Sequence, residues 1–305
     1  MTDSAPSADL GSAEGIQSAF REQGYIADRS LATVVFLALE LGRPLLLEGE
    51  AGVGKTELAK VLAASLGARL IRLQCYEGLD VNTAVYEWNY PRQMLEIRLL
   101  EARGAADHAT AHDIFGPEFL IKRPLLQALE STDGSAPVLL IDEIDRADEE
   151  FEAYLLEILS DFQVTVPEIG TVRADRPPRA ILTSNRTREV HDALKRRCLY
   201  HWIDYPTADK EFEIVLARLP GAPETLARRV VDVVHRLRGL ELTKVPGIAE
   251  TLDWTAALLA LGATDLNPQL LEETMGVVLK YEEDIRGLRG PRARELLGEA
   301  PASAR

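Results

Sequence analysis

The feature that most constrains this chain is a glycine-rich segment, GEAGVGKT, at residues 49–56. The apolar run 44–47 precedes it, and a helical pattern follows from Glu57. Strand, loop and helix in that order fit the phosphate-binding template G-x-x-x-x-G-K-[ST] at every fixed position. Glycines let the main chain curl so that N–H groups point at a phosphate, and the start of the next helix adds positive potential. The segment therefore predicts nucleotide binding rather than a plain glycine-rich turn.

Each residue of this loop has an expected part in the binding. Lys55 would reach the β- and γ-phosphates of ATP, and the Thr56 hydroxyl would hold Mg²⁺. The remaining residues would line the phosphates with their main chain: Gly49, Glu50, Ala51, Gly52, Val53 and Gly54.

Composition limits the class of partner. The 305 residues carry a net charge of -15, whereas a duplex-binding protein usually presents a basic face. Nucleic acid is therefore a poor candidate for the main partner. No apolar run is long enough to span a bilayer, so we expect no membrane span. With two cysteines, Cys75 and Cys198, and no signal peptide, a cytoplasmic location is the natural expectation.

Hydrophobic patterning predicts the fold class. The runs 138–141 and 180–183 are apolar without alternation, as in strands buried on both faces of a parallel sheet. Strand patterns disappear after Thr207, and helical patterns follow. We therefore expect an α/β three-layer αβα nucleotide-binding domain with a parallel sheet, followed by a smaller all-helical lid domain. The expected boundaries are a flexible tail (1–15), the α/β domain (16–206), the lid domain (207–289) and a second flexible tail (290–305).

Local patterns add several elements. Residues 163–173 predict a β-hairpin, 83–88 have helical character, and one helix is expected near 268–285. On the helix after Asp148, the acidic side chains, Glu152 among them, predict a solvated face.

Two acidic residues end the strand at 138–141. Asp142 is placed to hold Mg²⁺, and Glu143 to orient and deprotonate a water for attack on the γ-phosphate. Taken alone, the pair fits equally well with an acidic helix start. The phosphate loop and the apolar strand favour the metal and base roles.

Polar residues also follow the next buried strand. The Asn185 amide can bridge to the γ-phosphate or to the attacking water, although asparagine is also common in turns. Lys195, Arg196 and Arg197 form a basic cluster after that strand. The cluster fits a solvated helix end, a nucleic-acid patch, which the overall charge disfavours, or an arginine finger that meets the γ-phosphate in a neighbouring subunit.

The order of these motifs resembles an AAA+ ATPase. The block from Asp142 to Ala147, DEIDRA, resembles the signature of the MoxR branch. Segments 73–80 and 86–90 are similar to MoxR-type proteins associated with carbon-monoxide dehydrogenase or molybdenum hydroxylase maturation. The resemblance covers roughly residues 23–288.

This resemblance implies several properties. The family forms hexameric rings of identical subunits with ATP between them, so Arg197 would be the finger and Arg196 its reserve. Tyr25 and Ile26 would line the adenine pocket. Segments 76–116 and 163–173 would face the pore or a protein client, such as a molybdenum hydroxylase. MoxR-type proteins also work with a partner that bears a von Willebrand factor A domain, and act as chaperones in metal-cofactor maturation or complex assembly.

The chain departs from the family at one place. The family's sensor-two arginine is missing from the aligned stretch 247–254, which leaves Arg238, Arg286 or a weakly coupled lid as alternatives. Two other functions stay open: a small-molecule phosphotransferase on the same loop, and a nucleic-acid motor or loader, which the acidic charge disfavours.

Overall fold

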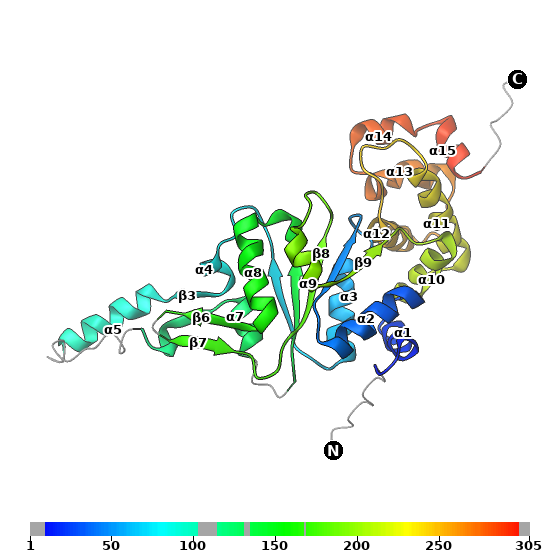
Figure 1. The fold of residues 1–305 in the computed structure, drawn as a ribbon. Helices are drawn as coiled ribbons and strands as arrows, with labels where there is room; N and C mark the ends of the chain where they lie inside the picture. Colours follow the sequence, from blue (N-terminus) through cyan, green and yellow to red (C-terminus); the bar gives the residue numbers. More distant parts are fainter. Residues whose placement is uncertain (1–9, 103–114, 131–134, 168, 299–305) are drawn as a thin grey trace, which may run out of the picture. The chain divides into compact units, whose positions relative to one another are not determined.

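The computed structural model describes residues 10–102, 115–130, 135–167 and 169–298 (Figure 1). Its helices and strands follow in this order: α1 (Ala13–Glu22), α2 (Arg29–Leu41), β1 (Leu45–Gly49), α3 (Lys55–Ser65), β2 (Leu70–Gln74), α4 (Val81–Ala84), β3 (Tyr86–Trp88), α5 (Tyr90–Ala102), η2 (Pro117–Phe119), β4 (Leu120–Lys122), α7 (Pro124–Leu129), β5 (Val138–Asp142), η3 (Ile144–Arg146), α8 (Glu149–Asp161), β6 (Gln163–Val166), β7 (Gly170–Arg173), β8 (Arg179–Ser184), α9 (Asp192–Arg197), β9 (Leu199–Ile203), α10 (Ala208–Arg218), α11 (Glu224–Arg238), α12 (Ile248–Ala260), α13 (Pro268–Val278), α14 (Glu282–Gly287) and α15 (Pro291–Leu296).

The chain divides into two compact units. The first unit comprises residues 1–16, 29–48 and 59–202, and the second comprises 17–28, 49–58 and 203–305. The glycine-rich loop thus belongs to the same unit as the helices at the C-terminal end. The domain boundaries given by the sequence stay predictions.

A five-stranded sheet in the order β2-β5-β8-β1-β9 forms the centre of the fold. The pairs β2–β5, β5–β8 and β1–β8 are parallel. β9 runs parallel to β1 as well, because Leu199 N–H donates to Pro44 O at one end and Ile203 lies against Gly49 at the other. This sheet, with helices on its faces, confirms the predicted α/β fold with a parallel sheet.

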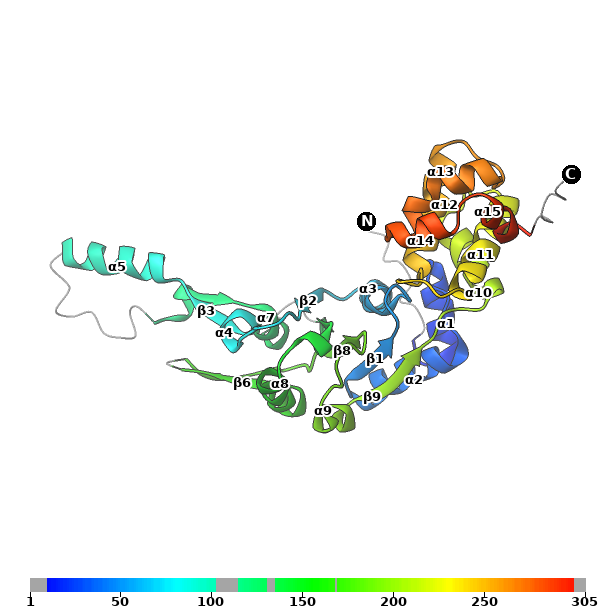
Figure 2. The ribbon, with the colours of Figure 1, turned by 90° about the horizontal axis from the view of Figure 1, so that it is seen from above.

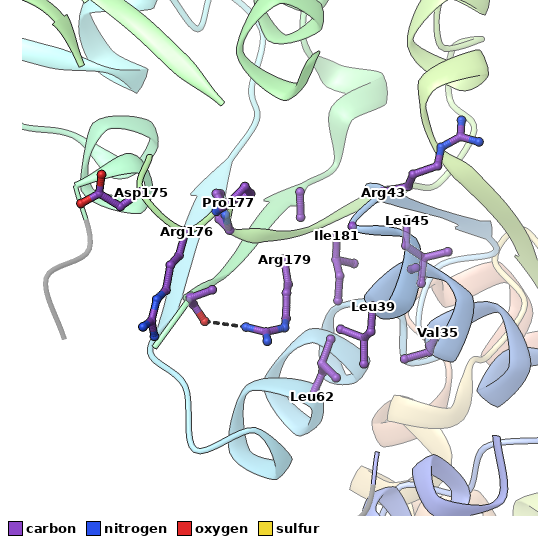
Figure 3. A pocket seen from close by; sticks show the side chains of 15 residues that line it. Val35, Leu39, Arg43, Leu45, Leu62, Asp175, Arg176, Pro177, Arg179 and Ile181 are labelled. Atoms are coloured by element: carbon purple, nitrogen blue, oxygen red, sulfur yellow. Dashed lines mark hydrogen bonds between the residues drawn. The ribbon is translucent and has the colours of Figure 1, made fainter. Parts of the chain in front are cut away.

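Alternate strand residues face opposite helix layers. Leu139 and Leu182 pack in a core that also contains Leu155 of α8. Leu45 and Ile181, which point to the other face, lie beside side chains of α2 and α3 (Figure 3). Burial on both faces explains why these strands show continuous apolar runs rather than alternation.

Two antiparallel strand pairs accompany the sheet. β6 and β7 form the predicted hairpin at 163–173. β3 pairs with β4, so the helical character predicted for 83–88 is wrong for residues 86–88. Trp88 makes edge-to-face contacts with Tyr86 and Phe115, and such aromatic contacts favour a pleated strand over a helix.

Helix α5 follows β3 and extends away from the sheet (Figures 1 and 2). Four of its large apolar side chains are exposed: Tyr90, Met94, Leu95 and Leu99. The predicted insert 76–116 continues into residues 103–114, which lie outside the described residues.

The second unit contains helices α10 to α15, with Trp254 fully buried in its core. The single helix predicted near 268–285 is interrupted, because Leu279 adopts an extended conformation that buries its side chain. The tail predicted from residue 290 is wrong for residues 291–296, which form α15. Buried Ala293 and Leu296 anchor that helix in the core, and residues 299–305 lie outside the description.

Candidate functional site

The glycine-rich loop has a backbone that requires glycine. Gly49, Gly52 and Gly54 all have positive φ angles, of 154°, 79° and 96°. A Cβ on Gly49 would lie 2.3 Å from Ile203 O, so a side chain cannot fit there. The buried Lys55 ammonium donates to Gly49 O and Glu50 O, both at 2.7 Å. The loop therefore already has a conformation suited to phosphate binding. Its lysine, Lys55, is held at the turn where it would contact a phosphate.

Tyr25 lies beside the loop within the same unit. Its ring approaches the position of a Gly54 Cβ to 3.6 Å and meets Phe20 edge-to-face at 5.8 Å. Burial, and then the charges of Asp28 and Glu57, raise the pKa of Tyr25, so its hydroxyl stays neutral. Ile26 is buried next to it. The Tyr25 ring therefore offers an apolar surface next to the loop.

Asp142 ends β5 at the carboxyl edge of the sheet and is 2 % exposed. Arg72 of β2 donates to its Oδ2 through Nε at 3.0 Å and Nη2 at 2.6 Å, and the Thr183 hydroxyl donates to Oδ1. Such charge-assisted bonds fix the orientation of a buried carboxylate. Neither Arg72 nor Thr183 was identified from the sequence.

The donor set at this edge fits Mg²⁺. Among the described residues, no group of three or more His, Cys, Asp or Glu side chains gathers into a metal cage. Magnesium characteristically uses one or two carboxylates together with phosphate oxygens and water. The single, oriented Asp142 carboxylate matches that requirement.

Glu143 adopts a left-handed conformation, with φ 56° and ψ 51°. This conformation is unfavourable for a side chain larger than glycine and marks many functional sites. Glu143 N–H donates to the Thr183 hydroxyl at 3.0 Å, so Thr183 fixes both acidic residues. The Glu143 carboxylate is one-third exposed and lies 3.4 Å from Arg146 Nη1.

Buried Asp145 organises the turn that carries Asn185. Its carboxylate accepts from the N–H groups of Asn185, at 3.2 Å, and Thr187, at 2.9 Å, and from the Thr187 hydroxyl at 2.7 Å. Asn185 follows β8, the strand next to β5, so the parallel register brings Asp142, Glu143 and Asn185 to one edge of the sheet.

A second buried carboxylate, Glu152, continues this support towards α9. It accepts from the Arg188 guanidinium and from His191 N–H at 2.7 Å. The prediction that Glu152 lies on a solvated face is wrong, because it pairs with Arg188 in the interior. A spacing pattern on α8 cannot show a partner 36 residues away in the chain.

The end of α9 presents two exposed arginines. Arg197 Nε donates to the Ser160 hydroxyl at 2.6 Å, and Nη1 lies 3.5 Å from Ala193 O. Both acceptors are neutral, and the ion pairs among the described residues do not include Arg196 or Arg197. Arg43 donates to the carbonyls of Arg196 and Arg197, at 2.8 and 3.3 Å, and fixes this helix end. The two side-chain charges are therefore presented to the surroundings.

The comparison with protein families decides the identity. The family model described as "AAA domain (dynein-related subfamily)" matches residues 44–198, just over half of the chain. The matched region contains the glycine-rich loop, both acidic residues, Asn185 and the α9 arginines. The chain belongs to this AAA family.

Two curated proteins are similar to this AAA protein. The gas vesicle ATPase GvpN1 of Halobacterium salinarum is 26% identical over 272 residues, which cover 82% of this chain and 73% of that protein. The denitrification regulatory protein NirQ of Pseudomonas aeruginosa is 24% identical over 219 residues, covering 69% and 73%. Among solved structures, a RuvB mutant of Thermotoga maritima has a TM-score of 0.49 at 19% identity, covering 95% of this chain and 86% of that one.

The family match gives the protein's general class. It is an AAA+ ATPase of the MoxR-like type, which binds nucleotide and hydrolyses ATP to ADP and phosphate. Within the described residues, none of its helices combines the length and apolar character needed to cross a membrane.

Both arginines considered as substitutes for sensor two pair with carboxylates of their own unit. Arg238 is 9 % exposed and donates through both Nη atoms to Glu211, at 2.6 and 2.8 Å. Arg286 pairs with Glu282 on the surface of α14. Within this unit, the start of α12 contacts the loop through its main chain, because Ile248 N–H donates to Gly52 O at 3.1 Å.

A cavity of about 360 Å³ lies at the opposite edge of the AAA sheet, where β1 and β8 begin (Figure 3). Val35, Leu39 and Leu62 form its apolar wall, and Arg179 donates to Ala136 O beside it. Because it opens at the amino ends of the strands, this cavity is separate from the edge that carries Asp142.

Both cysteines are buried, and burial raises the pKa of each thiol to about 12. They are therefore protonated near neutral pH and act as small core residues.

Proposed function

We propose that this AAA+ ATPase assembles as a ring, with six subunits as the expected number, in which Arg197 of one subunit completes the site of the next. The observation that carries the proposal is the presentation of Arg197. Its guanidinium is exposed, it has neutral acceptors for partners, and Arg43 and Glu152 fix the segment that carries it. An exposed cation on a fixed helix end supports a role in contact with another chain.

The chemical roles follow from the donors at each position. Lys55 binds the phosphates, while Thr56 and Asp142 hold Mg²⁺. When bound, Mg²⁺ neutralises charge on the phosphate oxygens. The Glu143 carboxylate accepts a proton from the water that attacks the γ-phosphorus, and the bond from that phosphorus to the ADP oxygen breaks. Asn185 orients the water.

Tyr25 and Ile26 are proposed to contact the adenine. The position of the Tyr25 ring beside Gly54 supports this assignment, since a base must lie near the loop that holds its phosphates. The remaining loop residues, Gly49 to Val53, contribute main-chain contacts to the phosphates.

We further propose that hydrolysis drives remodelling of a protein client. Exposed Tyr90, Met94 and Leu95 on α5 support a protein partner, because clustered exposed apolar side chains often mark interaction sites. The relatives named for gas vesicles and for denitrification indicate that this ATPase type serves different systems. For this chain we favour a cytoplasmic chaperone role in metal-cofactor maturation, with a von Willebrand factor A domain partner and a molybdenum hydroxylase as client.

The base assignment is tested with Glu143→Gln. We expect this variant to bind ATP normally but to lose about 100-fold or more in turnover, since general-base catalysis contributes at least that much. Glu149→Gln, an exposed acid on α8, is the matched control and should retain full activity. Rapid hydrolysis by the Glu143 variant would contradict the assignment.

Concentration dependence tests the assembly. Turnover per chain should rise with protein concentration, because each site needs its neighbour. Turnover that does not depend on concentration, in a monomer, would favour a small-molecule phosphotransferase. Strong stimulation by DNA would favour a nucleic-acid motor.

A further inference from the structure

The cavity at the amino ends of β1 and β8 lies entirely within the first compact unit. Its interior is apolar, with side chains from two helices and two strands: Val35, Leu39, Leu45, Leu62 and Ile181 (Figure 3). Its volume of about 360 Å³ falls within the range of ligand pockets, about 300–1,000 Å³. Since one water occupies about 30 Å³ in the liquid, the cavity has room for about ten non-hydrogen atoms of a ligand.

A guanidinium lies among these apolar side chains. Arg179, the first residue of β8, lines the cavity beside Leu62 (Figure 3). Its main-chain N–H donates to Pro137 O at 2.9 Å, and its Nη1 donates to Ala136 O at 3.0 Å, so the side chain is fixed at both ends. Ala136 O is neutral, and no ion pair within the described parts of the chain involves Arg179. A guanidinium has five N–H donors, so Arg179 keeps donors for an anion.

The charged residues around the cavity also favour an anion. Three arginines line it, Arg43, Arg176 and Arg179, together with one acid, Asp175. Three positive charges against one negative charge leave two positive charges, in a chain whose net charge is -15. Positive potential concentrated in one cavity of an acidic protein attracts a negatively charged ligand.

The geometry of the donors selects a carboxylate. A planar guanidinium binds a planar carboxylate through two parallel hydrogen bonds. A phosphate dianion would need a second cation in the interior, but the Arg43 guanidinium is already engaged with the carbonyls of Arg196 and Arg197. The apolar walls around Arg179 suit a hydrocarbon body. The ligand class is therefore a monocarboxylate with an apolar chain of about six to eight carbons.

Arg43 connects this cavity to the end of α9. It follows α2, and Val35 and Leu39 of that helix form part of the cavity wall. Its guanidinium donates to Arg196 O at 2.8 Å and to Arg197 O at 3.3 Å. A ligand packed against α2 therefore restrains the motion of the residue that fixes the arginine-bearing helix end.

We propose that this cavity binds a small amphipathic carboxylate, whose anionic head pairs with Arg179 and whose apolar body packs against α2 and α3. The occupied cavity holds Arg43 and the end of α9 more firmly, so the ligand raises ATP turnover. This second step rests on the proposed function, because it acts through Arg197, whereas binding does not depend on it. Since the cavity lies at the sheet edge opposite Asp142, the ligand is an effector and not a substrate.

Calorimetry on the full chain tests binding, with octanoate and its neutral isostere octanamide as probes. Octanoate should bind with a Kd of about 1 mM or tighter, and about tenfold tighter than octanamide. Arg179→Gln should weaken octanoate binding about tenfold and change octanamide binding less than about twofold. Arg69→Gln removes an exposed arginine at the same end of the sheet, which donates to Gln127, and should change neither affinity. Equal wild-type affinities for the two probes would overturn the pairing with Arg179.

A cavity-filling variant tests the location. Ala38 is a half-buried residue of α2 that lines the cavity. The phenyl ring of Ala38→Phe should occupy the space of the apolar body and weaken binding of both probes about tenfold. Unchanged binding in this variant would show that the ligand lies elsewhere and would overturn the assignment of the cavity.

ATPase assays test the effector role. Saturating octanoate should raise wild-type turnover about twofold or more. Arg43→Gln should still bind octanoate but should show no rise, because its hold on the α9 carbonyls is lost. No rise in the wild type, or an equal rise in the variant, would overturn the effector role and leave the binding site intact. A chain that binds no octanoate would overturn the whole inference and leave the proposed function intact, whereas failure of ring assembly would contradict the proposed function and leave the calorimetric result intact.

Discussion

Removal of the Glu211 carboxylate should strongly destabilise the helical unit. The side chain of Glu211 on α10 is fully buried and accepts two bonds from Arg238, with further donors in His235 and Thr251. Glu211→Ala leaves the Arg238 charge buried without its partner, which costs about 3–5 kcal/mol. That is a large part of a typical stability of about 5–15 kcal/mol.

The same helix offers a matched control two residues away. Glu213 also pairs with an arginine, Arg21, but the two side chains are 52 % and 65 % exposed. Glu213→Ala should therefore cost less than about 1 kcal/mol. The two variants remove the same type of ion pair and differ chiefly in burial.

Urea unfolding measured by Trp254 fluorescence gives the assay. Trp254 is fully buried in the helical unit, and Trp88→Phe with Trp202→Phe removes the other two tryptophans. With a typical urea slope, Glu211→Ala should lower the midpoint by about 2 M. The double variant Glu211→Leu with Arg238→Met should recover most of this loss. Equal effects of the Glu211 and Glu213 variants would refute the reasoning.

Three further predictions follow from local contacts. Gly247→Ala should cost about 1–3 kcal/mol and weaken ATP binding, because the new Cβ would meet the main chain of the loop. A Cβ on Gly276 in α13 would have no heavy atom within 4 Å, so Gly276→Ala should stabilise the chain by about 0.5–1 kcal/mol. Equal effects of the two glycine substitutions on stability would contradict the contact between Gly247 and the loop. Lys195 and then Arg186 hold the pKa of the exposed Glu189 carboxyl at about 2, below its usual 4.5. A lowered pKa gives stability that is present above pH 4.5 and is lost as the pH falls towards 2. Glu189→Gln should remove that part of the acid sensitivity in pH-dependent unfolding, and an unchanged pH profile would argue against the pairing.

The sequence predicted the parts of the fold that depend on local pattern. Apolar runs identified β5 and β8, and the spacing of glycines identified the loop, because burial on both faces and positive φ each restrict the residue types allowed. The hairpin of β6 and β7 was found because its strand and turn signals lie within one short segment, 163–173.

Residues that act through distant partners could not be found in this way. Arg72 lies 70 residues before Asp142, and Asp145 supports a turn 40 residues further along the chain. Glu152 looked like a surface residue because its partner, Arg188, comes from another element. Pairings of this kind are set by the sheet order, which a single sequence does not state.

Mixing two inactive variants tests the central claim most directly. Lys55→Ala should lose nucleotide binding but keep a working Arg197, whereas Arg197→Ala should keep its own nucleotide and lose the finger, with a loss of about 1,000-fold. Mixed in equal amounts, they should regain part of the wild-type ATPase rate, because an intact Arg197 then meets an intact Lys55 site in some pairs. A mixture that stays as inactive as each variant alone would contradict a site shared between neighbouring subunits.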